Sequence, residues 1–281
     1  MSIELDKRRD EALVSVAWLA DNLDRPGQRI IDMRKGDGYD ATHIPGAISH
    51  GGSPFLRENG DVVSPATFAN LMMTLGIDSH TDVIAYDDGN GLFAARLWWV
   101  ARYYGHGRIR VLDGGWDAWR AEGRETTSVQ ATPPAGAFVA RPRPELLATT
   151  EYVSAALARS DVQLLDVRGD EEWNRTASNE NAVAGHIPGA HHLVWTATVD
   201  PVSRRFLPGE VLHATFRAAG IVPGHEVVPY CQGGIRAAHT MLALHLAGIA
   251  PSRNYEGSWA AWSKAGMPIE LPMARPAGEA R

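Results

Sequence analysis

The chain of 281 residues carries the same series of short motifs twice, in the same order. Each half has an Asp-x-Arg strand end, a His-Ile-Pro-Gly-Ala segment, an apolar run that ends in Tyr, and a Gly-x-Trp turn. The offsets between the copies are 134 residues for Asp32 and Asp166, 143 for His43 and His186, 144 for Asp82 and Glu226, and 143 for Trp116 and Trp259. An offset this constant predicts two homologous domains in tandem.

The positions of the two copies give the expected domain boundaries. We expect a polar N-terminal tail at residues 1–12, a first domain at 13–130, a Pro-rich linker at 131–146, a second domain at 147–272 and a C-terminal tail at 273–281. Because the offset grows from 134 to 143 between the first two landmarks, an inserted surface loop is expected within about residues 169–183.

Within each half, short apolar strands alternate with helical segments. This alternation predicts an α/β fold in which a mainly parallel sheet has helices on both faces. The first helix is expected within residues 13–19, with Ser15 as its N-cap. In open sheets of this kind, ligands bind at the carboxyl ends of the strands.

The only cysteine, Cys231, lies at such a strand end. Residues 226–230 are typical of a buried strand, Gly233 and Gly234 interrupt the pattern, and residues 235–246 have helical spacing. The amides of such a loop and the helix dipole favour an anion, including a thiolate. A lone cysteine is often only a small buried hydrophobe, but the glycine loop favours a nucleophile here.

The repeat contains its own comparison for Cys231. The equivalent position of the first domain is Asp87, in the segment Asp-Asp-Gly-Asn-Gly. A carboxylate cannot replace a thiolate in sulfur chemistry. The first domain is therefore expected to be catalytically silent.

Taken together, these motifs resemble the tandem-domain sulfurtransferases of the rhodanese family. The resemblance covers about residues 13–269 and rests on both His-Ile-Pro-Gly-Ala segments, on Asp-Gly-Gly-Trp at 113–116, on Tyr-Glu-Gly-Ser-Trp at 255–259 and on Tyr230-Cys231 before the glycine loop. It implies two rhodanese-like domains. It also implies that Cys231 takes a sulfane sulfur from a small donor as a persulfide and passes it to a thiol or cyanide.

The residues after the cysteine are the expected substrate-binding loop. The resemblance implies that they form a cradle for the anionic persulfide, and they are Gln232, Gly233, Gly234, Ile235 and Arg236.

Two arginines are candidates for binding the substrate anion. A cation is unfavourable at a helix N-terminus, so we expect Arg236 to meet an anionic substrate. Arg168 is the second candidate, because the resemblance places the arginine of this motif near the site. Its copy in the silent half, Arg34, favours a structural ion pair instead. The mammalian enzymes have a further arginine four residues later, where this chain has Glu172.

The loop also bears on the choice of donor. Family members of the mammalian thiosulfate type carry Cys-Arg-Lys-Gly-Val-Thr, whereas mercaptopyruvate enzymes carry Cys-Gly-Ser-Gly-Val-Thr with a serine that assists proton handling. Here Gly233 takes the serine position and Arg236 retains one cation. Thiosulfate needs no proton removed from its sulfur, so it is the predicted donor, with 3-mercaptopyruvate as the alternative.

Two rival functions use the same cysteine. A phosphatase of the related dual-specificity fold has five residues between its Cys and Arg, whereas this chain has four between Cys231 and Arg236. The tighter loop favours sulfur. A sulfur-carrier or regulatory binding module with little turnover is the second rival, and Glu172 at the position of the family's arginine gives it weight.

Composition excludes several classes of function. The hydrophobic content of 44% and charged content of 21% are typical of a globular protein, and the net charge of −6 argues against nucleic acid or an anionic membrane as partner. The spacing of the histidines fits no metal site, and neither metal nor cofactor is expected. A single cysteine excludes an internal disulfide, and with no signal peptide evident the cytoplasm is the expected compartment.

Overall fold

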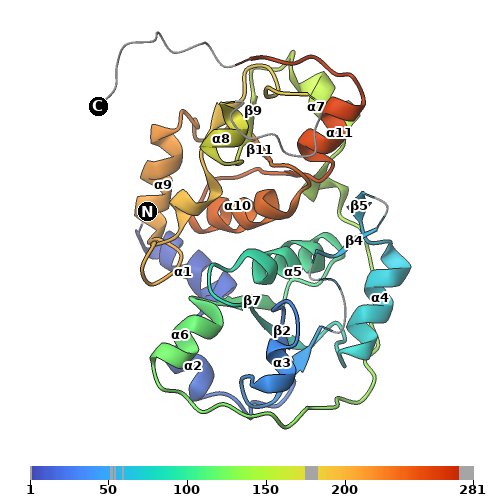
Figure 1. The fold of residues 1–281 in the computed structure, drawn as a ribbon, viewed down its shortest axis with the longest axis vertical. Coiled ribbons are helices and arrows are strands. Elements are labelled where there is room, and N and C mark those ends of the chain that lie inside the picture. Colours follow the sequence, from blue (N-terminus) through green and yellow to red (C-terminus); the bar gives the residue numbers. More distant parts are fainter. Residues whose placement is uncertain (1, 51–52, 54, 59, 175–182, 272–281) are drawn as a thin grey trace.

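The computed structural model describes residues 2–50, 53, 55–58, 60–174 and 183–271 (Figure 1). Two α/β domains meet along α5 (Leu92–Tyr103) and α10 (Ile235–Leu246), which lie side by side in the middle of the molecule. The predicted C-terminal tail and residues 175–182 of the predicted insertion lie outside the described residues.

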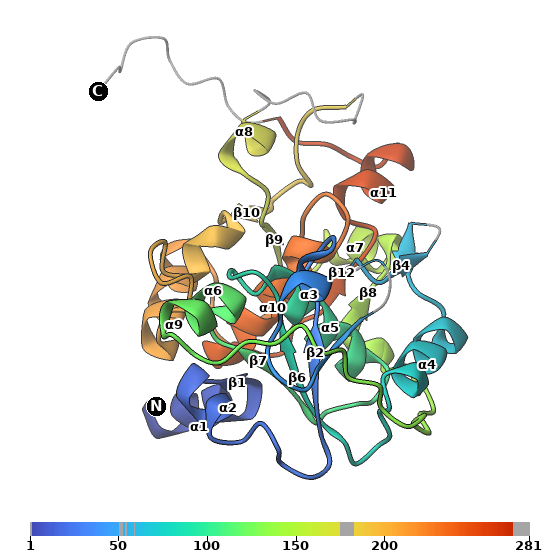
Figure 2. The same cartoon turned by 60° about the horizontal axis from the view of Figure 1, so that its bottom comes forward.

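The first domain is built on a parallel sheet of five strands in the order β1-β7-β6-β2-β3 (Figure 2). These are β1 (Leu13–Val14), β2 (Gln28–Asp32), β3 (Ala47–Ser49), β6 (Asp82–Tyr86) and β7 (Ile109–Leu112). Helices α2 (Val16–Ala20), α3 (Gly38–Ala41) and α6 (Gly115–Ala121) pack on one face, and α4 (Pro65–Thr74) and α5 pack on the other. A small antiparallel pair, β4 (Arg57–Glu58) and β5 (Asp61–Val62), precedes α4.

The second domain repeats this order. Strands β10 (His191–His192), β9 (Val162–Asp166) and β11 (Glu226–Tyr230) form one parallel sheet, and β12 (Asn254–Tyr255) pairs with β8 (Leu147–Ala148). A parallel bridge from Val227 to Ser252 joins the two groups, which gives the order β8-β12-β11-β9-β10. This sheet carries α7 (Thr150–Ala156) and α11 (Ser258–Lys264) on one face and α9 (Gly209–Ala218) and α10 on the other. The predicted α/β repeat with helices on both faces is confirmed.

One apolar core runs through both domains. Trp98 and Trp99 of α5 belong to the same buried cluster as Met241 and Leu242 of α10. At the same interface, Arg96 of α5 is fully buried and forms hydrogen bonds to both carboxylate oxygens of Glu256, each 2.7 Å long. Because the domains share a core and a buried ion pair, they form one body.

The N-terminal segment differs from the prediction. Residues 1–12 were expected to be a polar tail, but α1 (Ser2–Ala12) is a helix that packs against α9 and α10 of the second domain. Leu5 and Ala12 are buried, and Arg9 forms hydrogen bonds to Asp113 and to the carbonyl oxygens of Phe206 and Leu207. The sequence gives little sign of this helix because so few of its residues are apolar, and its stability comes from tertiary contacts.

The remaining local expectations concern the caps and the linker. Ser15 is the N-cap of α2, as predicted, and its hydroxyl accepts a hydrogen bond from the amide of Trp18. The predicted linker follows the surface of the first domain, where its amides at Gly136 and Arg141 donate to the carbonyl oxygens of Met73 and Tyr104, and it ends in a 3-10 helix, η1 (Pro144–Leu146). Two duplicated histidines, at 43 and 186, are buried and stack on Tyr39 and Trp173, in agreement with a structural role.

Two buried histidines of α10 should make the stability depend on pH. Burial lowers the pKa of His239 and of His245 to about 4, from an ordinary value of 6.5. Both therefore stay neutral in the folded protein while they gain protons in the unfolded chain. The free energy of unfolding should fall as the pH drops from about 6.5 towards 4, by at most about 1.4 kcal/mol per pH unit for each histidine.

Thermal or urea unfolding across this pH range checks the expectation. His239→Gln removes one of the two titrating groups and should flatten the profile, whereas His80→Gln, at an exposed position, should leave the slope unchanged. A slope that is equally steep in all three proteins would assign the acid sensitivity to other groups.

Candidate functional site

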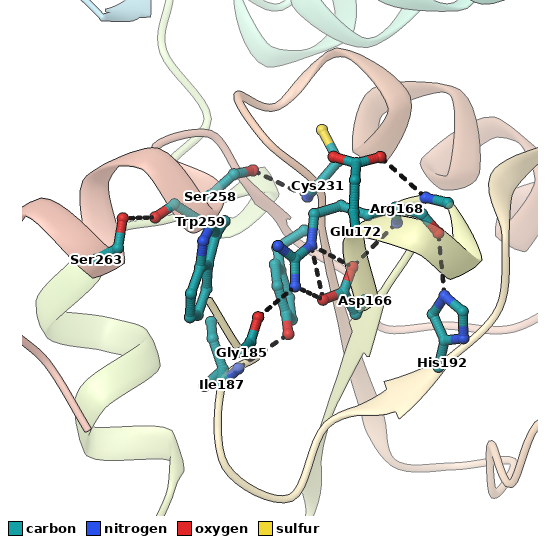
Figure 3. Close-up of polar contacts among 12 residues, drawn as sticks. Asp166, Arg168, Glu172, Gly185, Ile187, His192, Cys231, Ser258, Trp259 and Ser263 are labelled. Carbon is teal, nitrogen blue, oxygen red and sulfur yellow. Dashed lines mark hydrogen bonds and ion pairs between the residues drawn. The ribbon is translucent and has the colours of Figure 1, made fainter. Parts of the chain in front are cut away.

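Cys231 follows β11 directly and begins the loop that leads into α10 (Figure 3). The residue is only 1% exposed. Gly234, the N-cap of α10, has φ of +80°, in the left-handed region where glycine is favoured. A Cβ atom there would lie 2.5 Å from a carboxylate oxygen of Glu256, so the position requires glycine for space as well.

Ser258 holds the loop from the other side. Its hydroxyl accepts a hydrogen bond from the amide of Cys231 at 3.1 Å (Figure 3). It also accepts one from the amide of Gly234 at 3.0 Å and donates to the carbonyl oxygen of Tyr255 at 2.7 Å. Ser258 is fully buried and has φ of +50°. This residue was absent from the predicted site, although the repeated Gly-x-Trp turn that contains it was recognised.

A cleft of about 570 Å³ opens above Cys231 between the two domains. The second domain lines it with Cys231, Gln232, Gly233, Ile235 and Arg236. The first domain lines it with Lys35, Ser53, Phe55, Arg57, Leu92 and Phe93.

Two of the predicted site residues do not line this cleft. The amide of Gly234 donates a hydrogen bond to the hydroxyl of Ser258, and Gly234 is not among the residues that line the cleft. Arg168 is buried beside Asp166, where its Nε and Nη2 atoms bond to the carboxylate and Nη2 also donates to the carbonyl oxygen of Gly185 (Figure 3). Neither residue is therefore placed to contact a substrate directly.

The first domain contains the same arginine arrangement. Arg34 bonds to Asp32 with the same 2.6 Å contact that joins Arg168 to Asp166. Each guanidinium also lies over a tryptophan ring of its own domain. An arrangement present both in the domain that contains the cysteine and in the domain that lacks it favours the structural interpretation of Arg168.

Arg236 forms an ion pair with a carboxylate of the protein itself. Its Nη1 and Nη2 atoms donate to Glu172 of α8 (Asp170–Trp173), at 2.5 and 2.9 Å. Burial alone would lower the pKa of Arg236, but the hydrogen bonds to Glu172 and the attraction of the Cys231 sulfur raise it overall. Arg236 is therefore paired with a carboxylate, and Glu172 explains how a cation is tolerated at this helix N-terminus.

Sequence reasoning missed the cations of the first domain. Arg57 of β4 reaches across the cleft, and a Cβ atom added to Gly233 would lie 2.5 Å from its Nη1 atom. Lys35 lies just beyond β2, with its Nζ atom 4.2 and 4.8 Å from the ring centres of Phe55 and Phe93. Only the assembled domains bring these residues to Cys231.

The equivalent loop of the first domain holds its own anion. The carboxylate of Asp87 is buried and accepts hydrogen bonds from the amides of Gly89, Gly91, Phe93 and Ala94, at 2.7 to 3.2 Å. This loop is one residue longer, since β6 and β11 begin 144 residues apart whereas the N-caps of α5 and α10 are 143 apart. A carboxylate thus fills the space that a substrate anion would need.

Within the described part of the chain, no group of three His, Cys, Asp or Glu side chains could hold a metal ion. No helix among these residues is long and apolar enough to span a membrane.

Comparison with known proteins identifies the family. The model of the rhodanese-like domain matches residues 15–122 and 149–265, so the chain belongs to the rhodanese family and contains two copies of its domain. Thiosulfate sulfurtransferase from Corynebacterium glutamicum is 35% identical over 275 residues, which are 92% of this chain and 90% of that protein. The chain is a sulfurtransferase of the thiosulfate and 3-mercaptopyruvate type.

Two further relatives show how sulfur handling varies among similar chains. Sulfur carrier protein TtuD from Thermus thermophilus is 32% identical over 279 residues, which are 92% of this chain and 96% of that protein. The crystal structure of SseA from Escherichia coli, described as a 3-mercaptopyruvate sulfotransferase, has a TM-score of 0.79 and 28% identity, and the match covers 88% of this chain and 98% of that one.

Removing the hydroxyl of Ser258 should loosen the loop. Ser258→Ala leaves the buried amides of Cys231 and Gly234 without a partner, so the free energy of unfolding should fall by about 1–3 kcal/mol and sulfur loading of Cys231 should slow. Ser263→Ala serves as the matched control, because Ser263 lies on the same helix and bonds only to carbonyl oxygens of that helix. Equal effects of the two substitutions would contradict a specific role for Ser258.

Proposed function

We propose that the protein transfers a sulfane sulfur from thiosulfate to a thiophilic acceptor, such as cyanide or a thiol, through a persulfide on Cys231. The observation that carries the proposal is the placement of the one cysteine in the wall of a cleft that Arg236, Arg57 and Lys35 also line. The loop amides and the N-terminus of α10 add further positive potential.

The reaction divides into two displacements at sulfur. The Cys231 thiolate attacks the outer sulfur of thiosulfate, the S–S bond of the donor breaks, and sulfite leaves with the electron pair. Cyanide then attacks the outer sulfur of the persulfide, thiocyanate leaves, and the thiolate is restored. Neither step requires an external oxidant or reductant, and Arg236 lines the same cleft as the sulfur that carries the charge.

The surroundings of Gly233 support thiosulfate as the donor. The mercaptopyruvate loop has a serine here, but in this chain the guanidinium of Arg57 lies where that side chain would begin. The site therefore offers a cation at the point where proton handling would be needed. A cation suits a dianion such as thiosulfate better than it assists the loss of a thiol proton.

A sulfur carrier is the second candidate function. One observation favours it, which is that Glu172 already occupies both terminal nitrogens of Arg236. The similarity to a protein named as a sulfur carrier points the same way. A carrier would accept sulfur from a donor but release it slowly to small acceptors, so the rate of thiocyanate formation separates the two functions.

Intact mass spectrometry tests the persulfide. Incubation with thiosulfate should add the mass of one sulfur atom to the wild-type protein and nothing to Cys231→Ser, which is nearly isosteric and should remain folded. Subsequent addition of cyanide should return the wild-type mass and produce thiocyanate. An added sulfur in the serine variant would disprove the assignment of the nucleophile.

A comparison of donors tests the proposed substrate. With cyanide as acceptor, kcat/KM for thiosulfate should exceed that for 3-mercaptopyruvate, because the loop holds cations and lacks the serine hydroxyl. A clear preference for 3-mercaptopyruvate would show that other residues of the cleft select the donor.

A further inference from the structure

The charges of the second domain near Cys231 are already balanced by carboxylates. Arg236 is paired with Glu172, and Arg168 is paired with Asp166. A donor anion that enters the cleft would have to compete with these carboxylates for their guanidinium groups. Among the described residues of the second domain, each of these two arginines near the loop therefore has a carboxylate partner.

Arg57 differs because it shares its carboxylate with another arginine. Glu256 is bound through both oxygens by the fully buried Arg96, and the Nε atom of Arg57 lies 3.2 Å from one of the same oxygens. Two guanidinium groups thus face one carboxylate, which leaves one net positive charge. Since the Arg96 side chain has 0% exposure and that of Arg57 has 25%, the excess charge is available at Arg57, in the cleft wall.

Lys35 supplies a second cation on the same wall. Its ammonium group lies against the rings of Phe55 and Phe93 and forms no ion pair with any residue that the structure describes. An ammonium held over aromatic rings keeps its charge while its position becomes restricted. Lys35 and Arg57 both line the cleft that contains Cys231.

We propose that Lys35 and Arg57, residues of the silent domain, bind the anionic end of the sulfur donor and stabilise the anion that leaves. The inference rests on the proposed function, in which the donor is thiosulfate. The three oxygens of its sulfonate end would face the two cations while its outer sulfur faces Cys231. As the S–S bond breaks, negative charge grows on the departing sulfite, and fixed cations stabilise that charge most. The first domain would thus supply the positive charge that Glu172 neutralises in the second domain.

The test uses a reaction of Cys231 that does not depend on sulfur transfer. Iodoacetate, an anion, and iodoacetamide, which is neutral, both alkylate the single cysteine, and the ratio of their rates reports the positive charge in the cleft. Lys35→Met and Arg57→Gln should each lower this ratio about fivefold or more at low salt. Arg57→Lys should largely keep it. The exposed residues Lys7 and Arg143 provide the matched controls Lys7→Met and Arg143→Gln, which should change nothing.

The same variants are then assayed with thiosulfate and cyanide. Lys35→Met and Arg57→Gln should raise the KM for thiosulfate about fivefold or more, and the effect should shrink as salt is added. An unchanged alkylation ratio would overturn the inference, whether both rates stay the same or both slow equally, because equal slowing marks a structural effect and not a loss of positive charge. If wild-type protein keeps the high ratio but never gains sulfur from thiosulfate, the cation site stands and the proposed donor fails.

Discussion

The carboxylate of Glu256 fixes how the two domains meet. Glu256 is 1% exposed. Its carboxylate contacts Arg96 and Arg57 of the first domain and the side-chain amide of Asn254. A buried carboxylate without such partners would be strongly destabilising, so the domains cannot shift relative to each other without a large cost. The same carboxylate borders Gly234 in the loop of Cys231. One ion-pair cluster therefore positions the interface, the cleft wall and the loop together.

The first domain uses the equivalent position in the same way. Asp113 precedes the Gly-Gly-Trp turn, as Glu256 precedes Gly-Ser-Trp, and the two lie 143 residues apart. Asp113 accepts hydrogen bonds from Arg9 of α1 and from the amide of Phe206, which belongs to the second domain. Each domain thus contributes one acidic side chain that contacts the other domain. The helix α1 belongs to this second cluster, which accounts for its order despite a polar sequence.

The sequence predicted those features that depend on local chemistry. Period and offset revealed the repeat, and the strand, glycine loop and helix around Cys231 follow from backbone preferences. It did not predict Ser258, Arg57 or Lys35. Ser258 is 27 residues from Cys231, and Arg57 lies in a short hairpin whose place over Gly233 depends on the docking of α5 against α10. Contacts of this kind form only after both domains have assembled, so the hydrophobic pattern of the sequence does not predict them.

Arg236 shows that a local argument can predict an anionic partner without identifying it. The reasoning that a cation at a helix N-terminus must face an anion was correct, but the anion is the side chain of Glu172. Glu172 stands where the mammalian enzymes have an arginine, and its charge reversal provides the partner of Arg236. The two residues are 64 positions apart, and only the fold of α8 beside α10 joins them.

Comparison of the two loops explains why the domains have different roles. In the first domain, the Asp87 carboxylate accepts four amide hydrogen bonds and so occupies its own anion cradle. In the second domain a thiol stands at that position, and the shorter loop is held instead by Ser258. A cradle filled by its own carboxylate cannot bind substrate, but the neighbouring cations of that domain, Lys35 and Arg57, still point into the shared cleft. Duplication followed by divergence of the two loops therefore accounts for a domain that lacks the cysteine and still lines the cleft around it.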